Sequence, residues 1–391
     1  MLHFFWTPYL FTQGLYDRYE SANNEIVKYA RKYFEMKVKT HVTNFNSGRV
    51  TDREEDILLG HPTWDASWTP GNTACRVLND WVRDNALTAD APCHPNTYIQ
   101  MPWLPVIFPE FHTPFIESQL AAARLIFAIC GDIWIRRTLA LDSESVHGAV
   151  KNKLVRVNLG CAGRLFPFKT VFGHKNRRNF LHISSLAPYK NIPLLVQSLD
   201  GINATLMIAS QSLKKTGWTE ARCKDEYGKI RQYKFYSLGT ISNSDPKLNA
   251  FLIENFDFYI QTSTFDAQAT VILENCARGI VPLVTQESGF SCPYAIYLTQ
   301  DPLKNRDIIQ QAMAMPEDEY VERSRGVRAH VLEHHDWGKI YGRIWSAIEA
   351  DQQGRARNVQ SPTVDVETAA AGEMSPCSLV YRTRGLEGTC S

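Results

Sequence analysis

Residues 256–285 read FDFYIQTSTFDAQATVILENCARGIVPLVT, and this stretch decides the fold. Its first apolar run predicts a buried strand that ends at Thr262. A polar loop with Asp266 follows, then a helix that carries Glu274 and ends at Gly279, and then a strand from Val281 to Thr285. A strand, a helix and a second strand in this order are typical of the βαβ unit of a parallel sheet.

Short apolar runs alternate with amphipathic stretches on both sides of this unit. The alternation stops once, at residues 166–179, where basic residues gather without a steady period. We therefore expect an α/β fold of two Rossmann-like, doubly wound domains that face each other across a cleft. The expected segments are an N-terminal domain (1–168), a linker (169–179), a C-terminal domain (180–334), a last amphipathic helix (335–350) and a disordered tail (351–391) that lacks an apolar face.

The periodicity also predicts the individual elements. In the first half, strands are predicted at residues 2–6, 38–42, 56–60, 124–130 and 154–158, and helices at 17–36, 72–85 and 112–123. In the second half, strands are predicted at 180–184, 205–209, 234–238, 256–262 and 281–285, and helices at 192–199, 245–255, 270–278, 306–314, 318–335 and 335–350.

The composition excludes several classes of protein. Among 391 residues, 42 are Lys or Arg and 41 are Asp or Glu, and this balance argues against a nucleic-acid-binding platform. The nine cysteines are scattered without a CxxC pair, which indicates buried free thiols in a reducing compartment and no structural zinc. We find no signal peptide, and the apolar runs fall short of the roughly 18 residues that span a bilayer. We expect a cytoplasmic protein without a metal site.

The two carboxylates of the opening stretch lie at one end of one helix. Asp266 precedes the helix and Glu274 lies about one turn inside it, at the carboxyl edge of the predicted sheet. The backbone amides of Ala267 to Val271 point the same way and can bind a phosphate or sugar oxygen. Carboxylates that grip hydroxyls beside amides that accept anions suit a sugar nucleotide. The alternative is an acidic loop with a capping Asp and a solvated Glu. The chain has no GxGxxG and no GxxxxGK[ST] motif, so a dinucleotide or P-loop site lacks its main support.

The opening stretch resembles the E-x7-E signature of the family 4 retaining glycosyltransferases, whose usual form is Ser-x-x-Glu-Gly-Phe-Gly-x-x-x-x-Glu-Ala-x-x-x-Gly-x-Pro-Val-Val. The matching positions here are Ser263, Asp266, Glu274, Gly279 and residues 281–284. The sequence departs from the signature in three ways. The first acid is Asp, alanines replace both following glycines (Ala267 and Ala269), and the proline is shifted by one.

Four more segments match this family in the right order. Residues 182–191 resemble the Gly-Arg-Leu-x-x-x-Lys-Gly/Asn segment, with Lys190 at the lysine and Ser185 in place of the arginine. Residues 234–241 resemble the segment whose backbone meets the nucleobase, here at Gly239, Thr240 and Ile241. Residues 157–160 with Phe166 resemble the end of the first domain, and Asp336-Trp337 resembles the start of the helix that crosses back to it.

The resemblance implies a fold and an activity. Family members have the GT-B fold and transfer a sugar, here a hexosyl group, from a nucleotide donor to a hydroxyl with retention and without a bound metal. A UDP-sugar is the donor we expect first, as a co-substrate, and no cofactor is implied. Lys190 and the amides of Ala267, Gln268, Ala269 and Thr270 would hold the diphosphate. Glu274 would accept the ribose hydroxyls, and Asp266 would bind sugar hydroxyls and stabilise positive charge on the ring.

The N-terminal domain is expected to bind the acceptor, a sugar, a lipid or a small molecule. His61 follows a predicted strand and would orient an acceptor hydroxyl, although a loop histidine bonded to backbone is the alternative. Asp132 has the same placement, with a helix N-cap as the alternative, and Gly14 would let its loop approach the donor phosphates. The basic linker residues have three interpretations: they flank the diphosphate, contact anionic lipid at the inner face of a membrane, or are solvated. They are Lys169, His174, Lys175, Arg177 and Arg178.

Two other functions remain open from the sequence. An enzyme of another class on the same fold, such as a nucleotide-sugar 2-epimerase, would act on the donor alone. A phosphorylase would need a lysine for pyridoxal phosphate, and no motif marks one. A non-catalytic protein that binds nucleotide sugars would keep the fold and lose turnover. This alternative stays open because Ser185, Ala267 and Ala269 replace residues of the family signature.

Overall fold

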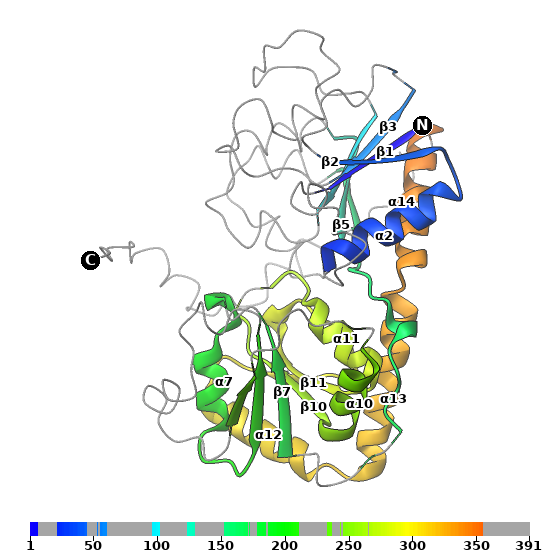
Figure 1. Ribbon diagram of the computed structural model, residues 1–391. Helices are drawn as coiled ribbons and strands as arrows, with labels where there is room; N and C mark the ends of the chain where they lie inside the picture. Colours follow the sequence, from blue (N-terminus) through cyan, green and yellow to red (C-terminus); the bar gives the residue numbers. More distant parts are fainter. Residues whose placement is uncertain are drawn as a thin grey trace, which may run out of the picture.

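The computed structural model of the chain is shown in Figure 1. It describes residues 1–6, 22–44, 53, 55–60, 96–101, 123–129, 152–170, 172, 178–184, 187–210, 233–236, 243, 245–264 and 266–354. These residues form two parallel sheets with helices packed on them (Figure 1). The predicted helix at 72–85, the predicted helix at 112–123 except for its last residue, and the tail beyond residue 354 lie outside the described residues.

The N-terminal sheet has six parallel strands in the described part of the chain, in the order β2-β1-β3-β4-β5-β6. The strands are β1 (Leu2–Trp6), β2 (Thr40–Asn44), β3 (Ile57–Gly60), β4 (Thr97–Met101), β5 (Leu125–Ile129) and β6 (Leu154–Val157). The sequence did not predict β4, because Thr97 and Gln100 interrupt its apolar pattern although neither is exposed to solvent. Helix α2 (Ala22–Glu35) packs on this sheet through Ile26, Val27, Ala30 and Phe34, which are fully buried.

The C-terminal sheet also has six parallel strands among the described residues, in the order β12-β11-β10-β7-β8-β9. The strands are β7 (Asn179–Ile183), β8 (Thr205–Ala209), β9 (Tyr233–Tyr236), β10 (Phe258–Gln261), β11 (Val281–Thr285) and the short β12 (Ile296–Leu298), which was not predicted. The helices are α7 (Ile192–Leu199), α10 (Pro246–Asn255), α11 (Thr270–Arg278), α12 (Pro302–Ala314) and α13 (Glu317–His334). Every residue of β10 and β11 is buried, as expected of strands that are covered on both faces.

The strand order reverses beside β7, and this reversal determines where a ligand can bind. Strands β8 and β9 extend the sheet on one side of β7, and β10, β11 and β12 extend it on the other. In doubly wound sheets, ligands bind outside the carboxyl ends of the strands at such a point. The carboxyl ends of β7 and β10, which pair in parallel, are Ile183 and Gln261. The segments that follow them therefore form the candidate site.

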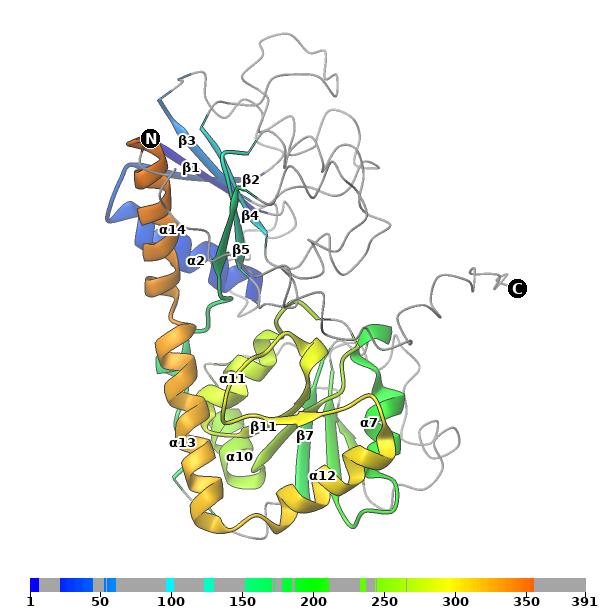
Figure 2. The same cartoon turned by 180° about the vertical axis from the view of Figure 1, so that it is seen from behind.

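The last helix crosses back to the N-terminal sheet. Figures 1 and 2 show α13 beside the C-terminal sheet and α14 (Trp337–Gln352) continuing beside α2. The Tyr341 hydroxyl donates to the Ile26 carbonyl at 2.9 Å, and the Trp337 indole donates to Glu25 at 3.1 Å. The helix ends two residues beyond its predicted end, where Asp351 accepts a 2.6 Å hydrogen bond from Tyr98 in β4. None of the helices that the structure describes is long and apolar enough to cross a membrane.

Residues 159–161, which we call the strap, pack against the junction of α13 and α14. The Cys161 amide donates to the His335 carbonyl at 2.7 Å, and the His335 ring bonds to the Leu159 carbonyl at 2.7 Å. A Cβ atom on Gly160 would lie 2.1 Å from the Trp337 ring, so only glycine allows this approach. The strap thus connects the two halves of the molecule, and little free space is left between it and the α13–α14 junction. Cys161 is a buried free thiol, as are Cys276 and Cys292.

Candidate functional site

Lys190 and Asp266 form a buried ion pair at the carboxyl edge of the C-terminal sheet. Lys190 ends a short 3-10 helix, Pro188–Lys190, which follows β7, and Asp266 lies in the loop after β10. Asn191 adopts a left-handed conformation with φ 49° and caps α7, so the chain turns sharply at Lys190. The lysine ammonium donates directly to the Asp266 carboxylate, and each residue is only 8% exposed. The predicted diphosphate lysine and the first predicted acid therefore lie side by side.

The loop that carries Asp266 is fixed by backbone contacts on both sides. The Asp266 amide donates to the Glu287 carbonyl at 2.8 Å, and the Thr264 amide donates to the Tyr189 carbonyl at 2.9 Å. Gly289 has φ +75°, and a Cβ atom there would lie 2.0 Å from the Ala267 carbonyl oxygen. The glycine lets the chain after β11 pass close to this loop. No local pattern marks Gly289, because the residue that it approaches, Ala267, lies 22 positions earlier in the chain.

A side-chain amide also holds the Asp266 carboxylate. Gln261, the last residue of β10, donates through Nε2 to Asp266 Oδ2 at 3.2 Å and to Ser263 Oγ at 2.7 Å. Its Oε1 accepts from the Tyr259 hydroxyl at 2.7 Å. Neither Gln261 nor Tyr259 was predicted as a site residue, because in a strand pattern both appear only as buried positions.

Glu274 projects from the second turn of α11 and is partly exposed. Its Oε1 accepts a hydrogen bond from Asn243 Nδ2 at 3.0 Å, and Asn243 Oδ1 in turn accepts from Arg278 Nη2 at 2.9 Å. Arg278 is 1% exposed, donates through Nε to Asn249 at 2.8 Å and lies 4.3 Å from the centre of the Phe166 ring. Burial lowers the pKa of the Arg278 guanidinium, and the negative charge of Glu274 opposes that shift. The second predicted acid is thus oriented by a buried cation through one asparagine.

The loop amides predicted to hold phosphate lie at the N-terminus of α11. Ala267, Gln268 and Ala269 are 3–7% exposed, and within the described residues no side chain caps this helix end. The first amides of a helix have no partner inside the helix and attract anions. The Gln268 side chain has a separate contact, because its Oε1 accepts a hydrogen bond from the Leu159 amide of the strap at 2.8 Å.

His182 lies behind the site on β7. Burial lowers its pKa to about 4, and a bond from the ring to the Ile260 carbonyl opposes this shift. Its Nδ1 lies 2.7 Å from that carbonyl and must carry the proton, so its Nε2 accepts from the Ser184 hydroxyl at 2.8 Å. The imidazole is therefore neutral at physiological pH and works as a fixed structural partner.

The basic linker does not supply Lys169 to the site. Lys169 is fully buried, and its ammonium donates to the Ile253 carbonyl at 2.6 Å and pairs with Asp257 at 2.9 Å. The expectation that it flanks a diphosphate, contacts lipid or is solvated is therefore wrong. A lysine at the C-terminal end of α10 instead interacts favourably with the helix dipole. Arg178 is exposed, while His174, Lys175 and Arg177 lie outside the described residues.

Several predicted site residues also lie outside the described residues. They are Gly14, His61, Asp132, Ser185, Gly239, Thr240 and Ile241. Their proposed contacts with the acceptor, the phosphates and the nucleobase stay predictions.

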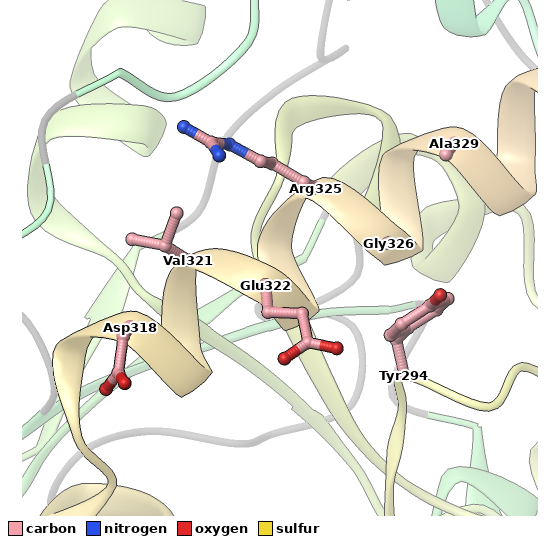
Figure 3. Close-up of a pocket in the computed structure, with 7 residues that line it drawn as sticks. All are labelled: Tyr294, Asp318, Val321, Glu322, Arg325, Gly326 and Ala329. Atoms are coloured by element: carbon pink, nitrogen blue, oxygen red, sulfur yellow. The ribbon is translucent and has the colours of Figure 1, made fainter.

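A separate pocket of about 520 Å³ lies on the outer face of α13. It is lined by Tyr294, Asp318, Val321, Glu322, Arg325, Gly326 and Ala329. Figure 3 shows the Glu322 carboxylate and the Tyr294 ring on the same side of the helix, whereas Arg325 points away from them. The pocket shares no residue with the site formed by Lys190, Asp266 and Glu274, so it is not the expected donor site.

Comparison with known proteins shows the fold. No protein-family model matches this sequence, and no curated protein matches it. Among solved structures, Anabaena HepE in complex with UDP and glucose is 13% identical with a TM-score of 0.56, and the match covers 90% of this chain and 100% of that chain. Trehalose-6-phosphate synthase OtsA from E. coli, bound with UDP-2-fluoro glucose, is 14% identical with a TM-score of 0.54 and coverage of 76% and 73%.

The third similar structure belongs to a longer protein. A variant of S. aureus TarM, in complex with fondaparinux, alpha-GlcNAc-glycerol and UDP, is 11% identical with a TM-score of 0.53. The match covers 83% of this chain and 59% of TarM, so the chain spans less than two thirds of that relative. These neighbours are glycosyltransferases of the GT-B type, and the two parallel sheets are arranged as in them. The fold that the sequence resemblance implied is therefore confirmed: the chain has the GT-B fold.

Proposed function

We propose that this chain is a glycosyltransferase that moves a sugar from a nucleotide-sugar donor, foremost a UDP-sugar, to a hydroxyl acceptor. One observation carries the proposal: Lys190 pairs with Asp266 just before the N-terminus of α11, the helix that carries Glu274. This site lies where the strand order of a GT-B sheet reverses. The described neighbours crystallised with UDP or a UDP-sugar support this choice of donor. We assign the donor to the C-terminal domain and the acceptor to the N-terminal domain.

The chemical problem in such a transfer is the charge of the leaving diphosphate. As the bond between the anomeric carbon and the diphosphate oxygen breaks, negative charge accumulates on that oxygen. In our proposal the Lys190 ammonium and the first amides of α11 stabilise this charge, so that no metal ion is required. Glu274, held by Asn243 at 3.0 Å, binds the ribose hydroxyls in our proposal.

The sugar carries the opposite charge in the transition state. Asp266 binds hydroxyls of the donor sugar and stabilises the positive charge that develops on its ring. We propose retention of configuration: the acceptor hydroxyl attacks from the face that the diphosphate leaves, forms the new C–O bond and gives its proton to the departing diphosphate oxygen. Both substrates are held in one cleft, which supplies much of the rate by orientation.

The donor loop, which precedes α11, and the N-terminal half are joined through Gln268 and Leu159, next to the α13–α14 junction.

We propose a cytoplasmic site of action, with the chain at the inner face of a membrane when the acceptor is a lipid.

Binding and turnover of UDP-sugars test the proposal. UDP should bind in calorimetry, and the protein should release the matching nucleoside diphosphate from at least one member of a UDP-, GDP- and ADP-sugar panel, with unchanged rate in EDTA. Release only with an added acceptor indicates transfer, and conversion of the donor without release indicates an epimerase. UDP binding without any turnover would indicate a non-catalytic binder. Failure of every nucleotide to bind would overturn the donor-site assignment.

A further inference from the structure

We propose that Gln261, supported by Tyr259, is a positioning residue that keeps the Asp266 carboxylate in place when Lys190 turns to the donor diphosphate. The inference rests on the proposed function, because it gives Asp266 and Lys190 their roles in that reaction. It concerns two strand residues that no sequence pattern indicates.

The amide of Gln261 has a fixed orientation. The side chain is 1% exposed, and its Nε2 donates to Asp266 Oδ2 at 3.2 Å and to Ser263 Oγ at 2.7 Å. Both amide hydrogens are therefore used. A flipped amide would place its oxygen against the carboxylate oxygen, and two acceptors repel each other, so the charge of Asp266 selects the orientation.

The amide is anchored to the sheet. Its Oε1 accepts from the Tyr259 hydroxyl at 2.7 Å, and the same hydroxyl lies 3.1 Å from the Ile183 carbonyl. Tyr259 is fully buried, and its ring stacks on His182 with 6.2 Å between centroids and 13° between planes. The position of Asp266 is therefore set by β10 and β7 as well as by its own loop.

Two donors share Asp266 Oδ2, and they differ in charge. The Lys190 ammonium and the Gln261 amide both donate to this oxygen. A diphosphate competes with Asp266 for the lysine, because it is also an anion and accepts several hydrogen bonds. Once Lys190 binds the diphosphate, Gln261 still holds the carboxylate. Because the amide is neutral, the negative charge of Asp266 then remains available to a positive sugar ring.

Three variants separate positioning from folding. Gln261→Met removes all three side-chain hydrogen bonds of Gln261 with a side chain of similar length, and Tyr259→Phe removes only the anchor. Tyr320→Phe is the matched control, because Tyr320 is also fully buried and its hydroxyl donates at 2.9 Å to the Asp257 carbonyl, which precedes β10 at the opposite end from Gln261. All three should lose some thermal stability, since each leaves a buried polar group with fewer partners.

The expected signature is a loss of kcat without a loss of donor affinity. With UDP-glucose as the probe, Gln261→Met should lower kcat for UDP release about tenfold or more, and Tyr259→Phe by a smaller factor. The UDP dissociation constant should change less than about twofold in both, and Tyr320→Phe should leave both quantities unchanged. Unchanged kcat in Gln261→Met and Tyr259→Phe, with an active wild type, overturns the inference and leaves the proposed function intact.

A second measurement decides the contact without turnover. In a cycle of Gln261→Met, Asp266→Asn and the double variant, the losses of Tm should be non-additive, because the same hydrogen bond is removed twice. Additive losses overturn the inference. If the wild type turned over no donor, the proposed function would fail, and the cycle would still decide whether Gln261 holds Asp266.

Discussion

The side chain of Gln268 accepts a hydrogen bond from the backbone amide of Leu159 at 2.8 Å, and it thereby joins the proposed donor loop to the strap. Both residues are buried, at 6% and 1% exposure. The loop that precedes α11 therefore cannot move independently of the strap, which connects the two sheets. The Gln268 side chain therefore contributes to the contact between the two halves of the molecule.

Replacing Gln268 by leucine should destabilise the fold. The substitution leaves the buried Leu159 amide without its acceptor, which costs about 1–3 kcal/mol of unfolding free energy. Urea unfolding followed by circular dichroism measures the change. Gln310→Leu is the matched control, because Gln310 is exposed on α12, and it should shift the midpoint little. Equal losses in the two variants would show that the Gln268 contact does not contribute.

Removing either of two charged donor contacts should reduce activity. Lys190→Ala and Glu274→Ala should each lower kcat/KM at least about tenfold, equivalent to roughly 1.4 kcal/mol of transition-state stabilisation. Steady-state release of UDP is the measurement, with circular dichroism to confirm folding. Lys304→Ala, at an exposed position on α12, should retain activity. Full turnover in a folded Lys190→Ala or Glu274→Ala protein would refute the assignment of that residue.

Asp266→Asn should separate donor binding from turnover. The substitution removes the anion that pairs with Lys190, so the lysine becomes free for the diphosphate and UDP should bind more tightly, by roughly two- to tenfold. Turnover should fall, because a neutral amide cannot stabilise positive charge on the sugar. Calorimetry with UDP and a kinetic assay with UDP-glucose measure the two effects. Weaker UDP binding in Asp266→Asn would show that the ion pair does not compete with the donor.

The protein should lose stability as the pH falls below about 6.5. Burial lowers the pKa of His335 to about 3 and that of His182 to about 4, whereas both are near 6.5 in the unfolded chain. For His335, the neighbouring His330 and His334 add to the shift, and the bond to the Leu159 carbonyl opposes it. Between these values the unfolded state binds more protons than the folded state. Each histidine therefore lowers the unfolding free energy as pH decreases, by up to about 1.4 kcal/mol per pH unit.

Unfolding midpoints at pH 7, 6, 5 and 4 measure this dependence. His335→Gln keeps a side-chain donor for the Leu159 carbonyl and removes one titrating group, so its stability should decline less steeply with acid than that of the wild type. Parallel curves for the two proteins would show that protonation of His335 does not contribute.

The sequence predicted the C-terminal half of the fold well. Strands β10 and β11 are apolar runs in which every residue is buried, and Gly279, at φ 82°, ends α11 as its position suggested. The resemblance to the family 4 glycosyltransferases placed Lys190 and Asp266 at one site, and they lie together because each follows a strand and the carboxyl ends of parallel strands meet at one edge. Strand β4 was missed, because the buried Thr97 and Gln100 give it a polar pattern.

The remaining contacts of the site depend on distant pairs. Asn243 reaches Glu274 across 31 positions, and no local pattern connects them. Arg278 would be expected at the surface by residue type, and only the fold shows that it is buried against Phe166. Lys169 was placed in an exposed basic linker for the same reason, although it is buried at the end of α10.

The pairing of Lys190 with Asp266 also has a consequence for the kinetics of donor capture. A cation and a carboxylate in contact act at a distance as a dipole, whose field falls off faster than that of a single charge. This pair therefore adds little to the long-range attraction of a nucleotide, and the on-rate should depend only weakly on ionic strength. Selection of the donor then takes place after encounter, when the diphosphate exchanges with Asp266 for the lysine.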